Sequence, residues 1–205
     1  MVARALNRQE SSGGGGAQDL LADYPRRGLK LSEYEHLVSV GAFDEERVEL
    51  LFGEILPMSP QGAPHRWLTV RLSTLLSEGI RRRAVIQSQT SLRGTADSMP
   101  EPDIAIIPHD ENRPDRLPER ALLIIEVAET SRKKDLGPKA RLYALSQCPH
   151  YWVFDLEKRF VRVHADPRDG EYRLVSTIVP GQGATLAVPD FPDIVLPIDE
   201  LFPPA

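Results

Sequence analysis

Residues 121–128 read Ala-Leu-Leu-Ile-Ile-Glu-Val-Ala, and this stretch decides the fold class. An apolar run without polar alternation is typical of a central strand that is covered on both faces of its sheet. Glu126 is the one charged residue in the run. A carboxylate in such a strand costs free energy unless a cation or a metal ion compensates its charge. Glu126 therefore marks either the exposed end of the strand or a functional site.

Upstream of this strand, the sequence predicts two helices, a hairpin and two single strands. A leucine and isoleucine repeat with helical spacing predicts a helix over about residues 65–83. A capping box formed by Ser32 and Glu35, with a stop at Gly41, predicts a shorter helix. The predicted strands are the two halves of a hairpin within residues 47–58 that turns at Gly53, then residues 85–92, then residues 104–107.

Downstream, a helix is expected from about Pro138 to Gln147, because proline is tolerated in the first turn of a helix. Residues 151–155 and 160–164 read as a hairpin, and a further strand is expected at residues 172–176. The whole order predicts an α/β (α+β) fold in which helices flank a mixed sheet.

Length and composition set the outer bounds of the protein. The chain of 205 residues is long enough for one domain, and 41% of its residues are hydrophobic. We predict a flexible tail over residues 1–28, which contain the glycine run Gly13–Gly16, and a single domain over residues 29–205. Cys148 is the only cysteine, so an intramolecular disulfide is excluded. No apolar run reaches the roughly 18–20 residues of a membrane span, and a cytoplasmic protein without membrane contact is predicted.

The net charge of −5 argues against a generic basic nucleic-acid binder. It does not exclude an enzyme that acts on nucleic acid, because a bound cation neutralises part of the acidic excess. The basic residues also cluster, at Arg81–Arg83 and at Arg132–Lys134. Each cluster is either a solvated surface or part of a nucleic-acid-binding surface.

Two further residues are candidates for chemistry alongside Glu126. Asp103 directly precedes the strand at residues 104–107, and if that strand lies beside residues 121–128, Asp103 and Glu126 converge. Two carboxylates at one point suit Mg²⁺ or Mn²⁺, which prefer oxygen ligands. Lys139 lies four residues after Asp135 and four before Tyr143, so all three share one face of a helix. Lys139 is then either a surface ion-pair partner or a cation that serves a phosphate-cleaving site.

These residues resemble a known nuclease signature. Pro102-Asp103 followed by Glu126-Val127-Ala128 is similar to the PD-(D/E)XK motif with its final lysine missing, because Ala128 stands at that position. The wider pattern resembles the Uma-two family of endonucleases over about residues 30–203. The segments that carry this resemblance are residues 47–55, Met58-Ser59-Pro60 with His65, residues 101–104, residues 125–127, Asp135 with Lys139 and Tyr143, and residues 151–155.

The resemblance implies a restriction endonuclease-like fold in which a neighbouring helix supplies the lysine, here Lys139. It also implies that Glu49 belongs to the site as an additional acidic residue and that His65 lies near it. The chain departs from the family pattern at Ala128-Glu129-Thr130 and at Gln147-Cys148-Pro149. These departures concern loops beside the site, so they bear on substrate fit rather than on metal binding.

The leading hypothesis is therefore a metal-dependent endonuclease that hydrolyses phosphodiester bonds in DNA. Asp103, Glu126 and the backbone carbonyl of Val127 are expected to bind Mg²⁺ (or Mn²⁺), and Glu49 to complete the acidic site or to bind a second ion. Lys139 is expected to stabilise the charge that develops on the phosphate. A homodimer is expected, because one site per subunit cuts one strand.

Two alternatives stay open at this stage. The same fold can serve as a catalytically inactive nucleic-acid-binding or assembly module, which the net acidity and Ala128 favour. A hydrolase that acts on a smaller phosphate ester is the third hypothesis. A narrow, closed pocket would indicate that third function, and an open groove would indicate a polymeric substrate.

Overall fold

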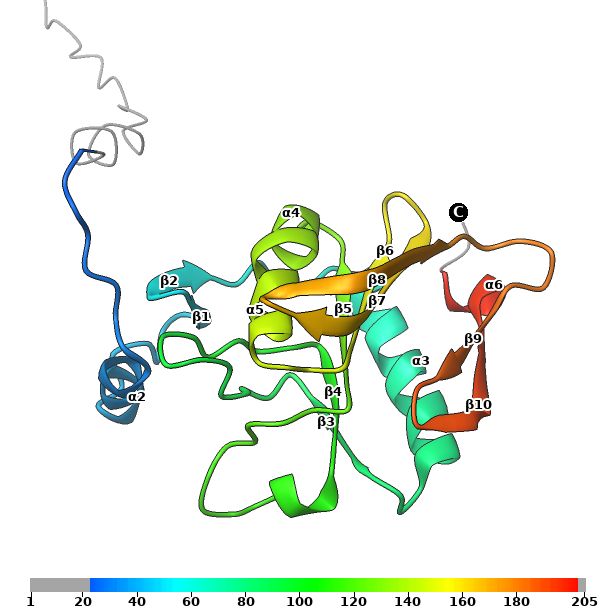
Figure 1. Cartoon of the computed structure of the whole chain (residues 1–205), viewed down its shortest axis with the longest axis horizontal. Helices are drawn as coiled ribbons and strands as arrows, with labels where there is room; N and C mark the ends of the chain where they lie inside the picture. The colour runs from blue at the N-terminus through cyan, green and yellow to red at the C-terminus, as the bar shows by residue number, and fades with distance from the viewer. Residues whose placement is uncertain (1–22, 203–205) are drawn as a thin grey trace, which may run out of the picture.

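The computed structural model describes residues 23–202, and its centre is a six-stranded mixed sheet (Figure 1). The strands lie side by side in chain order, and only β5 and β6 run parallel to each other. A parallel pair needs a long crossover connection, and the helical segment at residues 132–145 supplies it. The strands are β3 (Val85–Ser88), β4 (Ile104–Ile107), β5 (Leu123–Ala128), β6 (His150–Asp155), β7 (Phe160–Arg168) and β8 (Glu171–Ile178).

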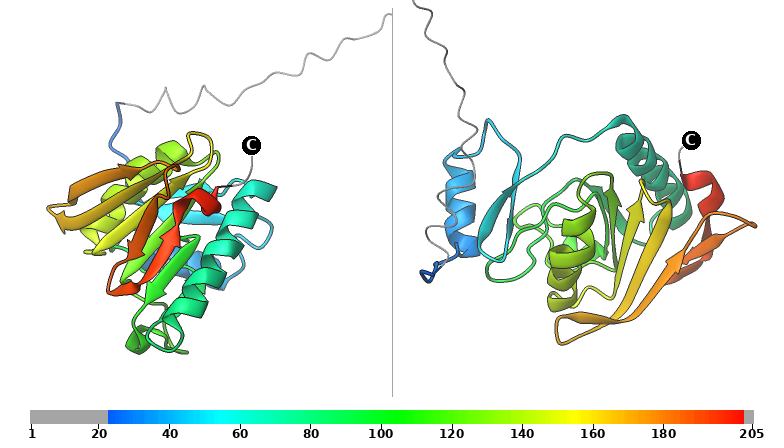
Figure 2. Two further views of the ribbon diagram at one scale, coloured as in Figure 1. Left: turned by 90° about the vertical axis from the view of Figure 1, so that its right-hand side faces the viewer. Right: turned by 90° about the horizontal axis from the view of Figure 1, so that it is seen from above.

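Both faces of the sheet are covered, as the apolar run at residues 121–128 predicts. Helix α3 (Ala63–Ile80) packs on one face together with the hairpin of β9 (Thr185–Val188) and β10 (Phe191–Pro197) and the short helix α6 (Ile198–Leu201). The segment at residues 132–145 packs on the other face, where Tyr143 and Tyr151 lie in a second apolar cluster (Figure 2). Every residue of β5 is buried.

The N-terminal part of the domain packs beside one end of the sheet (Figure 1). It consists of helix α2 (Leu31–Ser39) and the hairpin of β1 (Val48–Leu51) and β2 (Glu54–Pro57). Leu50 joins the hairpin to the domain, because its backbone N–H and carbonyl both bond to Met99. Phe52 and Gly53 both have positive φ, at 52° and 79°, as a two-residue hairpin turn requires. The predicted turn at Gly53 is therefore confirmed.

Two helix starts differ from the sequence prediction. The predicted capping box of Ser32 and Glu35 is wrong: the helix begins at Leu31, and the Glu33 carboxylate accepts the Lys30 backbone N–H at 2.9 Å. The predicted start at Pro138 is also wrong, since the helical segment begins six residues earlier, at Arg132. It runs through α4 (Arg132–Lys134), a π-helical turn η2 (Asp135–Lys139) and α5 (Ala140–Leu145).

Pro138 lies inside this segment because the π-helical turn accommodates it. Proline lacks an N–H donor, and its ring clashes with the carbonyl four residues earlier in a regular α-helix. A wider π turn relieves that clash and keeps the helix continuous.

A short 3₁₀ turn, η1 (His109–Glu111), lies in the loop between β4 and β5. Residues 1–22 of the predicted tail lie outside the described residues, and residues 23–28 are exposed without forming a helix or strand. Among the helices of residues 23–202, none is both long and apolar enough to cross a bilayer.

Candidate active site

The register of β4 and β5 brings the two predicted carboxylates together. Ile104 pairs with Ile125 in an antiparallel ladder, so Asp103 and Glu126 lie opposite each other one position further along. The Asp103 carboxylate also caps the end of this ladder, because its Oδ2 accepts the Val127 backbone N–H at 2.8 Å. The predicted neighbourhood of the two strands is thus confirmed, and it places the two carboxylates at one end of the sheet.

Asp103 is held from two elements. His65 of α3 places its Nε2 3.1 Å from Asp103 Oδ2, the oxygen that also accepts from Val127. The other oxygen, Oδ1, has only a long contact of 3.4 Å with Gln61 Nε2. Oδ2 is therefore committed to fixing the side chain, and Oδ1 faces the cavity with little competition from protein donors.

Glu126 is buried at the centre of the cluster and uses one oxygen for the protein. Its Oε1 accepts from Lys139 Nζ at 2.8 Å and from the Tyr143 hydroxyl at 2.9 Å. Burial raises the pKa of Glu126 well above its ordinary value, Lys139 opposes that rise, and the carboxylates around it add to it. No residue of the described chain donates a hydrogen bond to Glu126 Oε2.

Lys139 connects two buried carboxylates. Its Nζ lies 2.8 Å from Glu126 Oε1 and 3.1 Å from Glu49 Oε2. Burial alone would lower the pKa of Lys139, but the negative charges of Glu126, Glu49 and Asp135 outweigh it and raise the pKa. Lys139 is therefore a cation at neutral pH, and its ammonium group points into the acidic cluster.

Glu49 lies beneath the lysines and does not line the cavity. Its carboxylate is fully buried and contacts Lys134 Nζ at 2.5 Å and Lys139 Nζ at 3.1 Å. The Glu101 backbone N–H adds a weaker bond at 3.3 Å. Burial would raise the pKa of Glu49, but the two lysines lower it. The hairpin β1–β2 thus places the negative charge of Glu49 where it holds both lysines in position.

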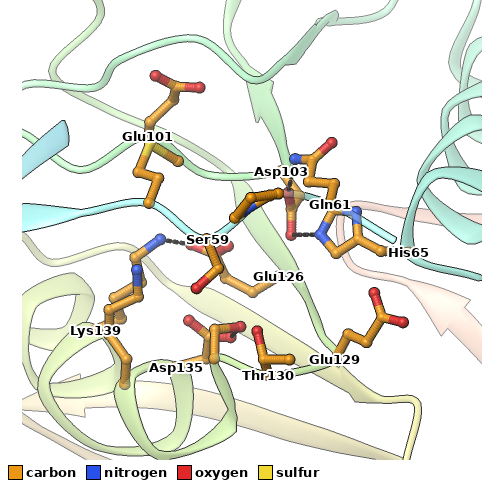
Figure 3. Close-up of a pocket in the computed structure, with 14 residues that line it drawn as sticks. Ser59, Gln61, His65, Glu101, Asp103, Glu126, Glu129, Thr130, Asp135 and Lys139 are labelled. Carbon is orange, nitrogen blue, oxygen red and sulfur yellow. Dashed lines mark hydrogen bonds and ion pairs between the residues drawn. The ribbon is translucent and has the colours of Figure 1, made fainter. Parts of the chain in front are cut away.

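The carboxylates open into a small cavity of about 50 Å³ (Figure 3). Besides Asp103, Glu126, Lys139 and His65, its walls include four side chains that were not proposed as site residues from the sequence: Gln61, Glu101, Ser131 and Asp135. Asp135 is buried, accepts from the Ser131 hydroxyl, and has a raised pKa because of burial. Its spacing of four from Lys139 was a signal for its position, whereas Gln61 and Ser131 lie in loops without a sequence pattern.

The donor set suits a divalent cation, although residues 23–202 hold no ready group of three or more His, Cys, Asp or Glu side chains that could bind a metal ion. Asp103 Oδ1 has only its long contact with Gln61, and Glu126 Oε2 accepts no hydrogen bond from the described residues, so both oxygens are open to a cation. The carbonyl of Val127 points to the same edge as its N–H, which bonds to Asp103. Mg²⁺ binds through one or two carboxylates and keeps several waters, so this set is sufficient.

The charge balance of the cluster supports the same conclusion. Four carboxylates, those of Glu49, Asp103, Glu126 and Asp135, surround the two ammonium groups of Lys134 and Lys139, which leaves a formal excess of two negative charges. A divalent cation would neutralise that excess and reverse the repulsion that raises the pKa of Glu126.

Comparison with known families now places the chain. A family model described as Uma2, "Putative restriction endonuclease", matches residues 31–199. The chain belongs to the Uma2 family. The match spans the N-terminal hairpin, the sheet and the helical segment that carries Lys139, so every residue of the cluster lies within the Uma2 region.

A solved structure shares this Uma2 fold. It is the crystal structure of a "putative nuclease belonging to DUF820" from Anabaena variabilis, with a TM-score of 0.62 at 16% sequence identity. The alignment covers 85% of this chain and 97% of that one. No curated protein matches the chain. The mixed α/β fold, with a six-stranded sheet and flanking helices, is therefore shown, as the sequence predicted.

Proposed function

We propose that this Uma2 protein is a Mg²⁺- or Mn²⁺-dependent endonuclease that hydrolyses phosphodiester bonds, with Asp103, Glu126 and Lys139 as its catalytic residues. One observation carries the proposal. Two carboxylates on adjacent strands face one cavity, and the ammonium group of Lys139 lies 2.8 Å from Glu126 in the same cluster. Family membership supports the reaction class.

Asp103 Oδ1, Glu126 Oε2 and the Val127 carbonyl are the groups that would hold the cation, and Glu49 completes the acidic site behind them. When bound, the ion would polarise the scissile phosphate and lower the pKa of water at the site. Around it, the protein keeps each ligand in place. His65 and the Val127 N–H fix Asp103, and Tyr143 fixes Glu126.

Lys139 supplies the positive charge that the transition state needs. An anionic phosphate gains charge on its oxygens during hydrolysis, and a fixed ammonium group stabilises that charge without reorganisation. Glu49 keeps Lys139 in place from below, at 3.1 Å. In this assignment Lys139 replaces the lysine that the nuclease signature has at the position of Ala128.

We further propose DNA as the substrate and a homodimer as the active form. Each chain carries one cluster of this kind among its described residues, and a single cluster cuts a single strand. Cleavage of both strands therefore requires two chains or two successive encounters. Sedimentation of the purified protein with and without duplex DNA tests the dimer directly.

The experiment that tests the function uses supercoiled plasmid with Mg²⁺, Mn²⁺ or EDTA. The native protein is compared with Asp103→Ala and Lys139→Ala, and with Arg141→Ala as a control, because Arg141 is exposed and lies outside the cavity. We expect metal-dependent nicking by the native and control proteins and its loss in both site variants. Circular dichroism shows whether each variant is folded under the assay conditions, and a loss of nicking supports the site only in a folded variant.

The alternative is a catalytically inactive nucleic-acid-binding module. It is favoured by Ala128, which stands where the signature has lysine, and by the net charge of −5. Binding of DNA without cleavage under any metal would select this alternative.

A further inference from the structure

Two larger hollows adjoin the catalytic cavity on different sides. The first, of about 670 Å³, lies beside β2 and the start of the helical segment and includes Arg132, Lys133 and Lys134; we call it the basic hollow. It shares five lining residues with the cavity, among them Ser59 and Ser131, so the two spaces are continuous.

The second hollow, of about 650 Å³, lies between α3 and β3, and we call it the polar hollow. Thr69, Ser73 and Ser77 of α3 line it at intervals of four residues, or about 6 Å along the helix axis. Ser88 and Gln89 line it from the end of β3. Gln61 lines both the polar hollow and the cavity, and it bonds to Gln89 at 2.8 Å.

We propose that the basic hollow, the cavity and the polar hollow form one track for an extended nucleic-acid strand, in which Lys133 and Arg66 bind phosphates on either side of the scissile one. This inference rests on the proposed nuclease function and adds the residues that hold the strand on both sides of the scissile phosphodiester.

Lys133 and Arg66 form no ion pairs with the described residues, and this supports the track. Lys133 lines the basic hollow and Arg66 lines the polar hollow, and both side chains are exposed. Neither forms an ion pair with any residue that the structure describes. By contrast, Arg71 on the next turn of α3 pairs with Glu200, and Arg83 pairs with Asp193. The two unpaired cations are thus available for phosphate.

No carboxylate of the described residues forms an ion pair with Lys133 or Arg66. In the basic hollow, Glu157 pairs with Lys158 at 3.2 Å, and the Gly62 backbone N–H, at 3.1 Å, holds Glu129 in position. Glu78 lies at the far end of the polar hollow, three turns of α3 beyond Arg66. The catalytic cluster itself is the acidic centre, and its excess charge is what a bound divalent cation would neutralise.

The lining of the polar hollow fits the sugar-phosphate backbone better than it fits bases. Hydroxyl and amide groups bond to phosphate and sugar oxygens, contacts that fix position but carry no sequence information. The cavity, at about 50 Å³, is the smallest of the three spaces and is where the scissile phosphate would lie. The track therefore predicts that the backbone of the strand supplies contacts on both sides of this phosphate.

Kinetics on two substrates test the track. The full-length protein is assayed with Mn²⁺ on a 20-nucleotide DNA and on bis(p-nitrophenyl) phosphate, a small diester that has no strand on either side of its phosphate. For Lys133→Ala and Arg66→Ala we expect kcat/KM to fall roughly tenfold on the oligonucleotide and to stay unchanged on the small diester. Equal losses on both substrates, or no loss on the oligonucleotide, would overturn the track.

The matched control is Arg141→Ala. Arg141 is also an exposed arginine without an ion pair in the described chain, but it lines a separate hollow between α5 and β8. The same change of charge there is expected to leave both substrates unaffected. A tenfold loss in this control would show that net charge, and not the track, determines the rate.

Binding in EDTA separates this inference from the proposed function. The slope of log Kd against log salt for a labelled single strand is expected to shrink by roughly 0.7 in each track variant, and not in Arg141→Ala. If neither substrate is cleaved but the slopes change as expected, the nuclease proposal fails and the track stands as a binding surface. If the slopes of the track variants equal the native slope, the track fails whatever the activity.

Discussion

At the scale of single residues, the site depends on one lysine shared by two buried carboxylates. An isolated buried charge is costly, and a buried pair offsets that cost only when its geometry is good. Lys139 meets this condition because it contacts Glu126 and Glu49 at 2.8 and 3.1 Å. The same contacts that prepare it for phosphate also stabilise the fold, so catalysis and stability are coupled at this residue.

Replacing Lys139 should therefore destabilise the protein as well as inactivate it. In Lys139→Met, two buried carboxylates lose their cation, and we expect the free energy of unfolding in EDTA to fall by about 3–5 kcal/mol. Adding Glu126→Gln to this variant should recover part of the loss, because one uncompensated charge is removed. Urea titrations of the three proteins measure these values. A loss below about 1 kcal/mol for Lys139→Met would contradict the assignment of a tightly coupled pair.

A second residue-scale prediction concerns His164, which lies away from the cluster. His164 is buried between Tyr151 and Tyr172, and its Nδ1–H donates to the Tyr151 carbonyl at 3.2 Å. Burial lowers the pKa of His164, and the positive charge of Arg162 lowers it further. The hydrogen bond to Tyr151 acts in the opposite direction. At a pH between the lowered pKa of the native state and the ordinary pKa of the unfolded chain, His164 therefore binds more protons in the unfolded chain than in the native state.

This difference in proton binding makes the folded protein less stable at lower pH. The contribution of His164 to stability is complete above the unfolded pKa, at about 6.5, and is lost as the pH falls toward the folded value. His164→Gln keeps a hydrogen-bond donor but does not titrate. We expect the decrease in unfolding free energy between pH 7.5 and pH 5.5, measured by urea titration, to be smaller in this variant. An equal decrease in both proteins would show that other groups cause it.

At the scale of elements, the sequence predicted the sheet better than the helix starts. The unbroken apolar character of residues 104–107, and of residues 121–128 apart from Glu126, indicates central strands. The loop between them is short enough to join neighbouring strands, and the structure shows that the two strands are paired. Asp103 and Glu126 could be found from that adjacency. Glu49 and His65 could be placed only by resemblance, because local patterns do not show how the hairpin and α3 dock on the sheet.

The predictions of helix starts were wrong where tertiary packing overrode a local sequence rule. Pro138 suggested the first turn of a helix, but packing of Tyr143 and Leu136 against the sheet continues the helix upstream through a π turn. Ser32 and Glu35 have the spacing of a capping box, but Glu33 occupies that role for Lys30. Sequence rules give several acceptable starts within one turn, and packing selects among them.

Replacing two glycines of different elements by alanine should have opposite effects on stability. Gly53 forms the hairpin turn at φ 79°, and a Cβ there would lie 2.7 Å from the Gly28 Cα, a backbone atom. Gly137 in the π turn has nothing within 4 Å of an added Cβ. We expect Gly53→Ala to lower the unfolding free energy by about 1–3 kcal/mol through strain, and Gly137→Ala to change it by less than about 1 kcal/mol, toward greater stability.

The hairpin links this stability effect to activity. β1 carries Glu49, which holds Lys139, so displacement of the turn in Gly53→Ala should also reduce plasmid nicking. Thermal unfolding and nicking assays of both variants measure the two effects. Equal stability of the two variants would show that the turn at Gly53 is not the constraint that positions Glu49.

At the scale of the whole molecule, the acidic charge and the proposed substrate are reconciled by the metal. A chain with a net charge of −5 repels nucleic acid at long range, yet its described residues gather four buried carboxylates in one cluster at the cavity and directly behind it. Burial, together with the neighbouring carboxylates, raises the pKa of Glu126 and Asp135, and a bound cation would favour their charged forms. Metal affinity should therefore be measurable as stability without any cleavage.

We therefore expect Mn²⁺ to stabilise the native protein against heat. A ligand that binds only the folded state at a concentration of about 100 Kd adds about 2.7 kcal/mol, and each kcal/mol raises Tm by roughly 2–4 °C for a domain of this size. The increase in Tm, followed by circular dichroism with and without Mn²⁺, should thus be roughly 5–10 °C. Asp103→Ala removes a proposed ligand and should lose most of this increase, whereas Arg141→Ala should keep it. If Mn²⁺ raises Tm equally in Asp103→Ala, the ion binds elsewhere on the acidic surface, and the assignment of Asp103 as a ligand is wrong.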